Sequence, residues 1–191
     1  MVAKLVCLII TLTLAAPVAV ASAQVIAPVV PGNLEAPSGQ PFLIAHADGT
    51  QGYTCVVSPG GFAWSFFGPQ ATLFNDGDQQ VTTHYLSANP DEGGALRATW
   101  RHSADTSTVW AGAIANSADP AFVTPGAIPW LLLRVVGHEE GPTGGATLSG
   151  AIYIQRVNTA GGAAPAAGCK TANDVGKRAL VPYTADYVFY R

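Results

Sequence analysis

Residues 153–169 read YIQRVNTAGGAAPAAGC, a strand-like run that passes into a glycine- and alanine-rich stretch and ends at Cys169. The first part alternates between apolar and polar side chains, as a β-strand with one buried face does. The second part, 158–168, has no large apolar side chain to pack, so we expect a surface loop with little packing of its own. A cysteine at the end of such a loop suggests that the loop is tied back covalently to the rest of the fold.

The N-terminus has the pattern of a secretory signal peptide. Lys4 precedes an apolar run of 12 residues, Leu5–Ala16, and Ala21-Ser22-Ala23 forms a small-x-small cleavage site before Gln24. The run is too short to predict a transmembrane span. We therefore expect residues 1–23 to be removed on export. The mature chain is then expected to be secreted or periplasmic, without a transmembrane anchor.

Cleavage would also change the cysteine count. It removes Cys7 and leaves Cys55 and Cys169 in an oxidising compartment, where a pair of cysteines normally forms a disulfide. Two free thiols or a metal-binding pair are the alternatives. The wide separation of the two residues and the absence of a CxxC motif favour the disulfide. It would join the far end of the 158–168 loop to an N-terminal strand.

Composition and motifs exclude several classes of function. With Lys4 removed, eight of the nine basic side chains remain against twelve acidic ones, and the closest basic cluster is only Lys177-Arg178. We therefore expect no nucleic-acid partner. The GxSxG, HExxH, P-loop and GxGxxG motifs are absent, which removes the common hydrolase, zincin and nucleotide signatures. The histidines at 46, 84, 102 and 138 are scattered, so we expect no metal site and no cofactor.

Turn residues separate short apolar or alternating runs along the mature chain. Residues 24–40 carry three prolines and no regular period, and predict a proline-rich extended leader. Beyond it, signals such as Asp48-Gly49 and Gly68-Pro69 separate the runs. The runs cover residues 42–46, 51–57, 62–67, 70–74, 79–86, 95–101, 107–114, 130–136, 147–157 and 183–190. This pattern predicts an all-β single domain over 41–191, a β-sandwich or barrel-like sandwich of about ten short strands with one disulfide.

Arg156 is an anomaly within this strand pattern. Alternation places it on the same side as Ile152 and Ile154, where a charge is costly unless it is paired. The strand could end or bulge there so that Arg156 points outward, or Arg156 could be buried against a carboxylate. The remaining alternative is an arginine that faces a ligand. The candidate carboxylates are Asp105, Glu139 and Asp186.

A polar–aromatic group on two predicted neighbouring strands is the best candidate site. It contains His84, Tyr85, Trp100 and Asp105, together with Arg101 and His102. If the strands pair, a tryptophan ring would lie beside an imidazole and a carboxylate, which is the arrangement that sugar or small-ligand recognition needs. The same residues could equally be a core tryptophan with satisfied polar neighbours. No serine or cysteine stands out as a histidine-activated nucleophile.

Several motifs along the chain resemble one family. They include GTQGYTC (49–55), IPWLLL (128–133), the 153–169 segment and VPYTADYVFY (181–190). The set resembles a family of secreted bacterial and fungal proteins known only as a domain of unknown function. The resemblance implies a signal peptide, one β-rich extracytoplasmic domain and paired cysteines at Cys55 and Cys169, and it implies no established activity. Where that family has a W-x-x-x-DGS-x-V stretch, this chain has Thr106 in place of the turn glycine, which puts the loop geometry in doubt.

These observations lead to three functional hypotheses. The first is a secreted binding or structural module whose partner is a glycan or a cell-envelope component, with His84, Tyr85, Trp100, Asp105 and Arg156 as candidate ligand-binding residues. The second is a hydrolase that uses His84 and Asp105 as acid and base. The third is a purely structural envelope protein without a ligand site, against which a deep polar–aromatic pocket would argue.

Overall fold

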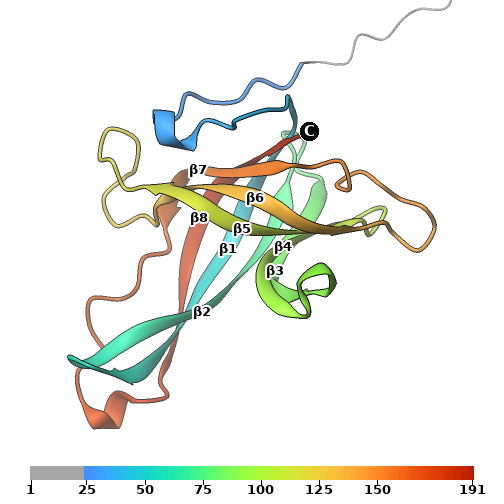
Figure 1. Cartoon of the computed structure of the whole chain (residues 1–191). Coiled ribbons are helices and arrows are strands. Elements are labelled where there is room, and N and C mark those ends of the chain that lie inside the picture. The colour runs from blue at the N-terminus through green and yellow to red at the C-terminus, as the bar shows by residue number, and fades with distance from the viewer. Residues whose placement is uncertain (1–23) are drawn as a thin grey trace, which may run out of the picture.

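Eight antiparallel strands form one sheet that closes on itself (Figure 1). The computed structural model describes residues 24–191, so the predicted signal peptide lies outside the described residues. Each strand pairs with the next one along the chain, and β8 returns to pair with β1. The strands are β1 (Pro41–Ser58), β2 (Gly61–Phe74), β3 (Gln80–Asn89), β4 (Ala95–His102), β5 (Thr108–Ser117), β6 (Trp130–Glu139), β7 (Tyr153–Gly161) and β8 (Arg178–Tyr190). The prediction of an all-β, barrel-like domain is confirmed.

The strands are fewer and longer than the sequence pattern predicts, with eight in place of about ten. Asp48-Gly49 is not a turn, because Asp48 pairs with Thr72 on one side and with Thr184 on the other. A Cβ atom at Gly49 would lie 2.2 Å from a carbonyl oxygen of β2. Only glycine therefore allows β1 and β2 to approach each other so closely at this position. Gly68-Pro69 likewise lies within β2, next to a bulge. The turn-like dipeptides therefore bend the strands without ending them.

The antiparallel order divides the connections between the two ends of the barrel. The β1–β2, β3–β4, β5–β6 and β7–β8 connections lie at one end, which we call the hairpin end because β1 and β2 project there as a long hairpin (Figure 1). The β2–β3, β4–β5 and β6–β7 connections lie at the other end, together with the start of β1 and the end of β8. We call this the terminal end. Three short 3-10 helices accompany the strands, and within residues 24–191 no helix is long and apolar enough to cross a bilayer.

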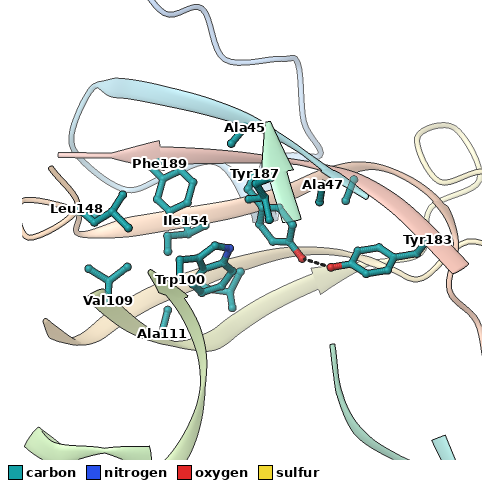
Figure 2. Packing of buried hydrophobic residues seen from close by; sticks show 14 of the residues in the cluster. Ala45, Ala47, Trp100, Val109, Ala111, Leu148, Ile154, Tyr183, Tyr187 and Phe189 are labelled. Atoms are coloured by element: carbon teal, nitrogen blue, oxygen red, sulfur yellow. Dashed lines mark hydrogen bonds between the residues drawn. The ribbon is translucent and has the colours of Figure 1, made fainter. Parts of the chain in front are cut away.

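Aromatic side chains fill the middle of the barrel. Trp100, Tyr187 and Phe189 are all nearly inaccessible to solvent, and the rings of Tyr187 and Phe189 pack edge-on against the indole of Trp100 (Figure 2). The alternation within 183–190 predicts that Tyr183, Tyr187 and Phe189 share one face, and all three point inward. The Tyr183 and Tyr187 hydroxyls lie 3.3 Å apart and form a hydrogen bond. Aromatic rings each bury a large apolar area, so these side chains contribute strongly to the core.

A second apolar cluster lies on the outside of the barrel. The segment 24–40 crosses this outer face and contains the 3-10 helix η1 (Gly32–Leu34). Leu34 is fully buried against a cluster that includes Trp130 and Val188, and its carbonyl accepts a hydrogen bond of 2.6 Å from Gln155. The leader is therefore extended apart from one turn, and it packs on β5, β6, β7 and β8.

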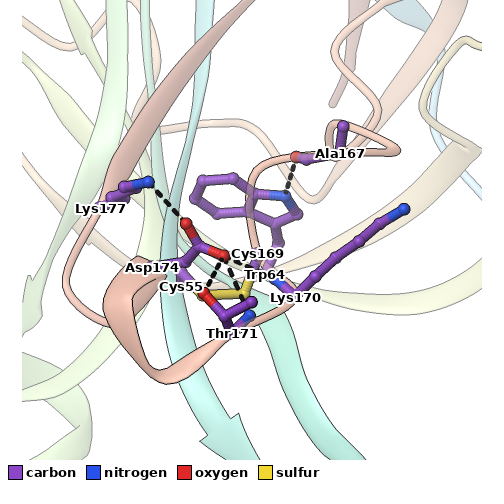
Figure 3. Close-up of a disulfide and its surroundings, with 8 residues drawn as sticks. All are labelled: Cys55, Trp64, Ala167, Cys169, Lys170, Thr171, Asp174 and Lys177. Carbon is purple, nitrogen blue, oxygen red and sulfur yellow. Dashed lines mark hydrogen bonds and ion pairs between the residues drawn. A yellow bond between two sulfur atoms is a disulfide. The ribbon is translucent and has the colours of Figure 1, made fainter.

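The long β7–β8 connection is fastened to the projecting hairpin by a disulfide (Figure 3). Cys55 and Cys169 have Cα atoms 5.4 Å apart and are both buried, which confirms the predicted bond. Beside them, the Trp64 indole donates a hydrogen bond of 3.1 Å to the carbonyl of Ala167. Asp174 closes the turn that follows by accepting hydrogen bonds from Thr171 and Lys177, and the bond from Lys177 holds its pKa well below the usual range. The connection is therefore ordered although it has few large apolar side chains.

Replacing both Cys55 and Cys169 with serine should lower the free energy of unfolding by about 4 kcal/mol, because a bond that closes so long a loop restricts the unfolded chain. Guanidinium unfolding curves measure the effect. The reduced wild-type protein is the matched control and should unfold together with the double variant. Superimposable curves for the oxidised wild type and the double variant would contradict the expectation.

Candidate functional site

A cavity of about 240 Å³ lies inside the barrel toward the hairpin end. All eight strands contribute to its lining. At the mouth, Phe66, Leu96 and Ala113 are exposed to solvent. The space exists because β4 and β5 present small side chains, Ala98 and Ala111, at positions where the deeper part of the barrel holds Trp100. The cavity is slightly smaller than the usual range for ligand pockets.

Stacked rings form the inner wall of the cavity. His84 on β3 lies opposite Trp100 on β4, with ring centroids 4.2 Å apart and planes nearly parallel. Tyr187 contacts both rings, at centroid distances of 5.1 Å and 5.4 Å. The hydrogen bond of 2.9 Å from His84 Nδ1 to the carbonyl of Thr99 leaves Nε2 as the unprotonated nitrogen. Burial lowers the pKa of His84 to about 3, so the imidazole is neutral at physiological pH.

Arg156 lies on the same inner surface. It pairs with Leu131 on β6 and with Tyr187 on β8, and its side chain lines the cavity. Its Nη2 donates a hydrogen bond of 2.8 Å to the carbonyl of Pro129, whereas its buried Nε has no partner. None of the ion pairs within residues 24–191 includes Arg156. Neither an outward-pointing arginine nor one paired with a carboxylate is observed among these residues; the side chain donates to a backbone carbonyl and lines the cavity.

Three residues that line the cavity carry a buried donor without a hydrogen-bond partner among the described residues. Within residues 24–191, six buried side-chain polar atoms have no hydrogen-bond partner, and three of them belong to residues that line the cavity. These are Gln51 Nε2, Trp100 Nε1 and Arg156 Nε, and all three are donors. A buried donor without an acceptor costs about 1–3 kcal/mol. The side chains of Gln51 and Arg156 lie next to the hydroxyls of Tyr183 and Tyr187, which can accept hydrogen bonds.

The remaining predicted site residues lie elsewhere. Tyr85 follows His84 on β3, so it points to the outside of the barrel, where it lines a groove with Trp110 and Glu139. Asp105 lies in the β4–β5 turn at the terminal end and does not line the cavity. The structure therefore brings His84, Trp100 and Arg156 together and separates Tyr85 and Asp105 from them.

Asp105 organises its own turn. Its carboxylate accepts hydrogen bonds from the backbone and hydroxyl groups of Ser107 and Thr147, which joins the β4–β5 turn to the β6–β7 connection. Burial opposes ionisation of Asp105, but the hydrogen bonds from Thr147 and Ser107 outweigh it and hold its pKa well below the usual range. Thr106 adopts a left-handed backbone with φ of 60°, so the β4–β5 turn forms without a glycine at this position. This is the position where the resembled family has glycine.

An acidic cluster surrounds His46 on the outer surface, apart from the cavity. His46 Nδ1 lies 2.6 Å from Asp186, and Nε2 lies 2.9 Å from Asp76. These two hydrogen bonds, first that with Asp186 and then that with Asp76, raise the pKa of His46. Asn158 donates a further hydrogen bond of 2.7 Å to Asp186. No group of three or more His, Cys, Asp or Glu residues between 24 and 191 is arranged to hold a metal ion.

Gln51 was missed as a site residue from sequence alone. It stands at the start of an expected run and its neighbours Thr50 and Gly52 are small, so nothing in the pattern distinguishes it from a surface glutamine. Tyr187 was assigned to the correct face, but its contact with Arg156 depends on the pairing of β7 with β8. The feature of the sequence that did point to this site was Arg156, a charged residue at a position where the strand pattern expects an inward-facing side chain.

The family model described as "Protein of unknown function (DUF3455)" matches residues 36–191. The chain belongs to the DUF3455 family. This confirms the expected resemblance at the level of an uncharacterised family. The match covers all eight strands of this DUF3455 domain, including every residue that lines the cavity. No curated protein and no solved structure matches the chain.

Thr106→Gly should raise the free energy of unfolding by up to about 1 kcal/mol, because glycine adopts the left-handed backbone without the cost that a β-branched residue bears. Thermal or urea unfolding measures the change. Thr72→Gly is the matched control: it lies in the extended backbone of β2 and should lower the stability. A loss of stability for Thr106→Gly equal to that of the control would contradict the expectation.

His46→Gln should destabilise the protein in a pH-dependent way. Because the folded pKa of His46 is raised above its ordinary value of 6.5, its stabilising contribution is complete below that value and is lost as the pH rises through the folded pKa. The difference in unfolding free energy between wild type and variant should therefore be largest near about pH 6 and shrink toward about pH 9. It should stay below about 1 kcal/mol, because the side chain is partly exposed. A difference that grows with pH would refute the assignment.

Proposed function

We propose that this DUF3455 domain is an extracytoplasmic binding protein that holds one small molecule inside its barrel, with an apolar part of the ligand against the apolar walls and a polar part at Arg156. The observation that carries the proposal is an arginine without an ion-pair partner among residues 24–191 that lines a largely apolar cavity with an exposed mouth. Eight-stranded barrels are wide enough either to be filled by side chains or to hold one small ligand. This barrel combines the two, with a filled terminal half and a hollow hairpin half.

The energetic argument favours a binding site over a merely imperfect core. Arg156 has no carboxylate partner within residues 24–191, and a half-buried guanidinium without a counter-charge is costly. An apolar side chain at this position would fit beside Leu131 and would avoid that cost. A ligand that accepts hydrogen bonds from Arg156 would offset it.

The geometry favours a small molecule over an intact polysaccharide. Trp100 is completely buried, so its ring cannot serve as a surface platform for a sugar chain. The expectation of a glycan or envelope partner stays a prediction. The size of the cavity limits the expected partners to molecules small enough to enter the barrel, such as a fragment of an envelope component.

The hydrolase hypothesis finds no support in the positions of its two residues. His84 lies within the barrel wall, neutral and stacked on Trp100, whereas Asp105 is occupied by hydrogen bonds in a turn at the terminal end. An acid and a base must reach the same substrate. These two side chains face different spaces.

The disulfide supports a location outside the cytoplasm. A buried cystine that ties a loop to a strand is typical of proteins that mature in oxidising compartments. Together with the predicted signal peptide, it favours a secreted or periplasmic binding protein over a cytosolic one.

Ala113→Trp should abolish ligand binding, because it places a large ring at the exposed mouth of the cavity without disturbing the buried core. Ligand-observed NMR with a library of small fragments measures binding. Ile114→Trp is the matched control: its side chain is on the same strand but outside the cavity lining, and it should leave binding unchanged. If no fragment binds the wild type, or if Ala113→Trp binds the same fragments, the proposal fails.

A further inference from the structure

We propose that the ligand is a small monoanion, with a carboxylate seated on the Arg156 guanidinium and an apolar body packed against the wall that contains Leu86, Leu131 and Phe66. The inference rests on the proposed function and names the chemical class of the ligand. Three observations carry it: the charge of the cavity, the geometry of the donors and the nature of the walls.

The cavity has a positive charge without a counter-charge. Its lining contains two charged residues, Arg97 and Arg156, and no carboxylate. Arg97 is already neutralised by Glu92, through hydrogen bonds of 2.7 Å and 2.8 Å from two of its nitrogens. Arg156 has no such partner within residues 24–191. A buried or half-buried guanidinium without an anion is costly, so an anionic ligand would relieve the site.

The donors match a planar oxyanion. A guanidinium presents several N–H groups in one plane, and it binds a carboxylate through two parallel hydrogen bonds. One Arg156 nitrogen is held by the Pro129 carbonyl, which fixes the plane, and Nε is unpaired. Because Arg156 is only half-buried, part of its guanidinium remains accessible to an acceptor in the cavity.

The total charge indicates a single negative charge on the ligand. His84 is the other basic side chain at the inner wall, and burial lowers its pKa to about 3. It therefore adds no second positive charge at neutral pH. A dianion such as phosphate would leave one charge unbalanced in a buried space. A carboxylate matches the site with no charge left over.

The remaining walls select an apolar body. Leu86 and Leu131 line the cavity together with the Phe66 ring. Aromatic and aliphatic surfaces of this kind favour a ring or a short chain by apolar burial and stacking. A volume of about 240 Å³ suits a molecule of the size of benzoate or hexanoate.

Titration calorimetry at neutral pH tests the inference with matched pairs: benzoate against benzamide, hexanoate against hexanamide, and inorganic phosphate. For the wild type we expect each acid to bind at least about tenfold more tightly than its amide, as a charge-assisted pair does relative to a neutral one. Phosphate should bind more weakly than either acid. Arg156→Met should reduce the acids to the level of the amides, and Arg156→Lys should restore part of the preference. Arg101→Met, an exposed arginine outside the cavity, is the control and should bind like the wild type.

The outcomes separate the inference from the proposed function. If acids and amides bind the wild type equally and Ala113→Trp abolishes both, the barrel binds small molecules but the anion assignment is wrong. Phosphate binding more tightly than the acids, or a preference for acids that survives in Arg156→Met, would also overturn the assignment. If no compound binds, both proposals fail. Because Arg156→Met removes an unpaired charge, we expect a higher melting temperature without ligand, and this readout shows that the variant is folded.

Discussion

The pairing of β8 with β1 is the constraint on which the rest of the structure depends. It runs from Pro41 opposite Tyr190 to Thr54 opposite Arg178, and it converts an open sheet with two free edges into a closed one. Closure fixes the inside and the outside for every strand, because alternate side chains must then point to the axis or to solvent. Arg156 is directed inward by this parity, since it lies two residues after Ile154 on a strand that pairs on both sides.

Side-chain size then decides which part of the interior is hollow. The terminal half is filled by Trp100, Tyr187 and Phe189, whose rings contact one another. Toward the hairpin end, β4 and β5 contribute Ala98 and Ala111, which are too small to reach across. The aromatic stack thus supports the inner wall of the cavity. Its packing in the terminal half stabilises the barrel and offsets the cost of the buried polar groups near the hairpin end that lack hydrogen-bond partners within the described chain. The arrangement is consistent with a scaffold that keeps a site ready in advance of its ligand.

The sequence was most informative where one signal decided the outcome. The all-β class and the bond between Cys55 and Cys169 each followed from a local pattern or a count. Alternation predicts that Tyr183, Tyr187 and Phe189 share a face, and only the structure shows that this face is the inner one. Local patterns could not distinguish a bend from a turn, because a glycine required by two closely approaching strands looks the same as a glycine in a hairpin. Asp48-Gly49 was therefore placed between strands although it lies within one. The expected proximity of His84 to Asp105 was wrong for a related reason: the distance along a strand carries Asp105 to the opposite end of the barrel, and only the closed topology reveals it.

The cystine has a consequence for when the binding site is complete. Gln51 and Phe66, which line the cavity, lie close along the chain to Cys55 and to its strand partner Trp64. In a reducing environment this part of the hairpin is held to the β7–β8 connection by hydrogen bonds alone. Oxidation adds the covalent brace next to the rim. In the proposed extracytoplasmic location, disulfide formation would therefore complete the rim of the cavity.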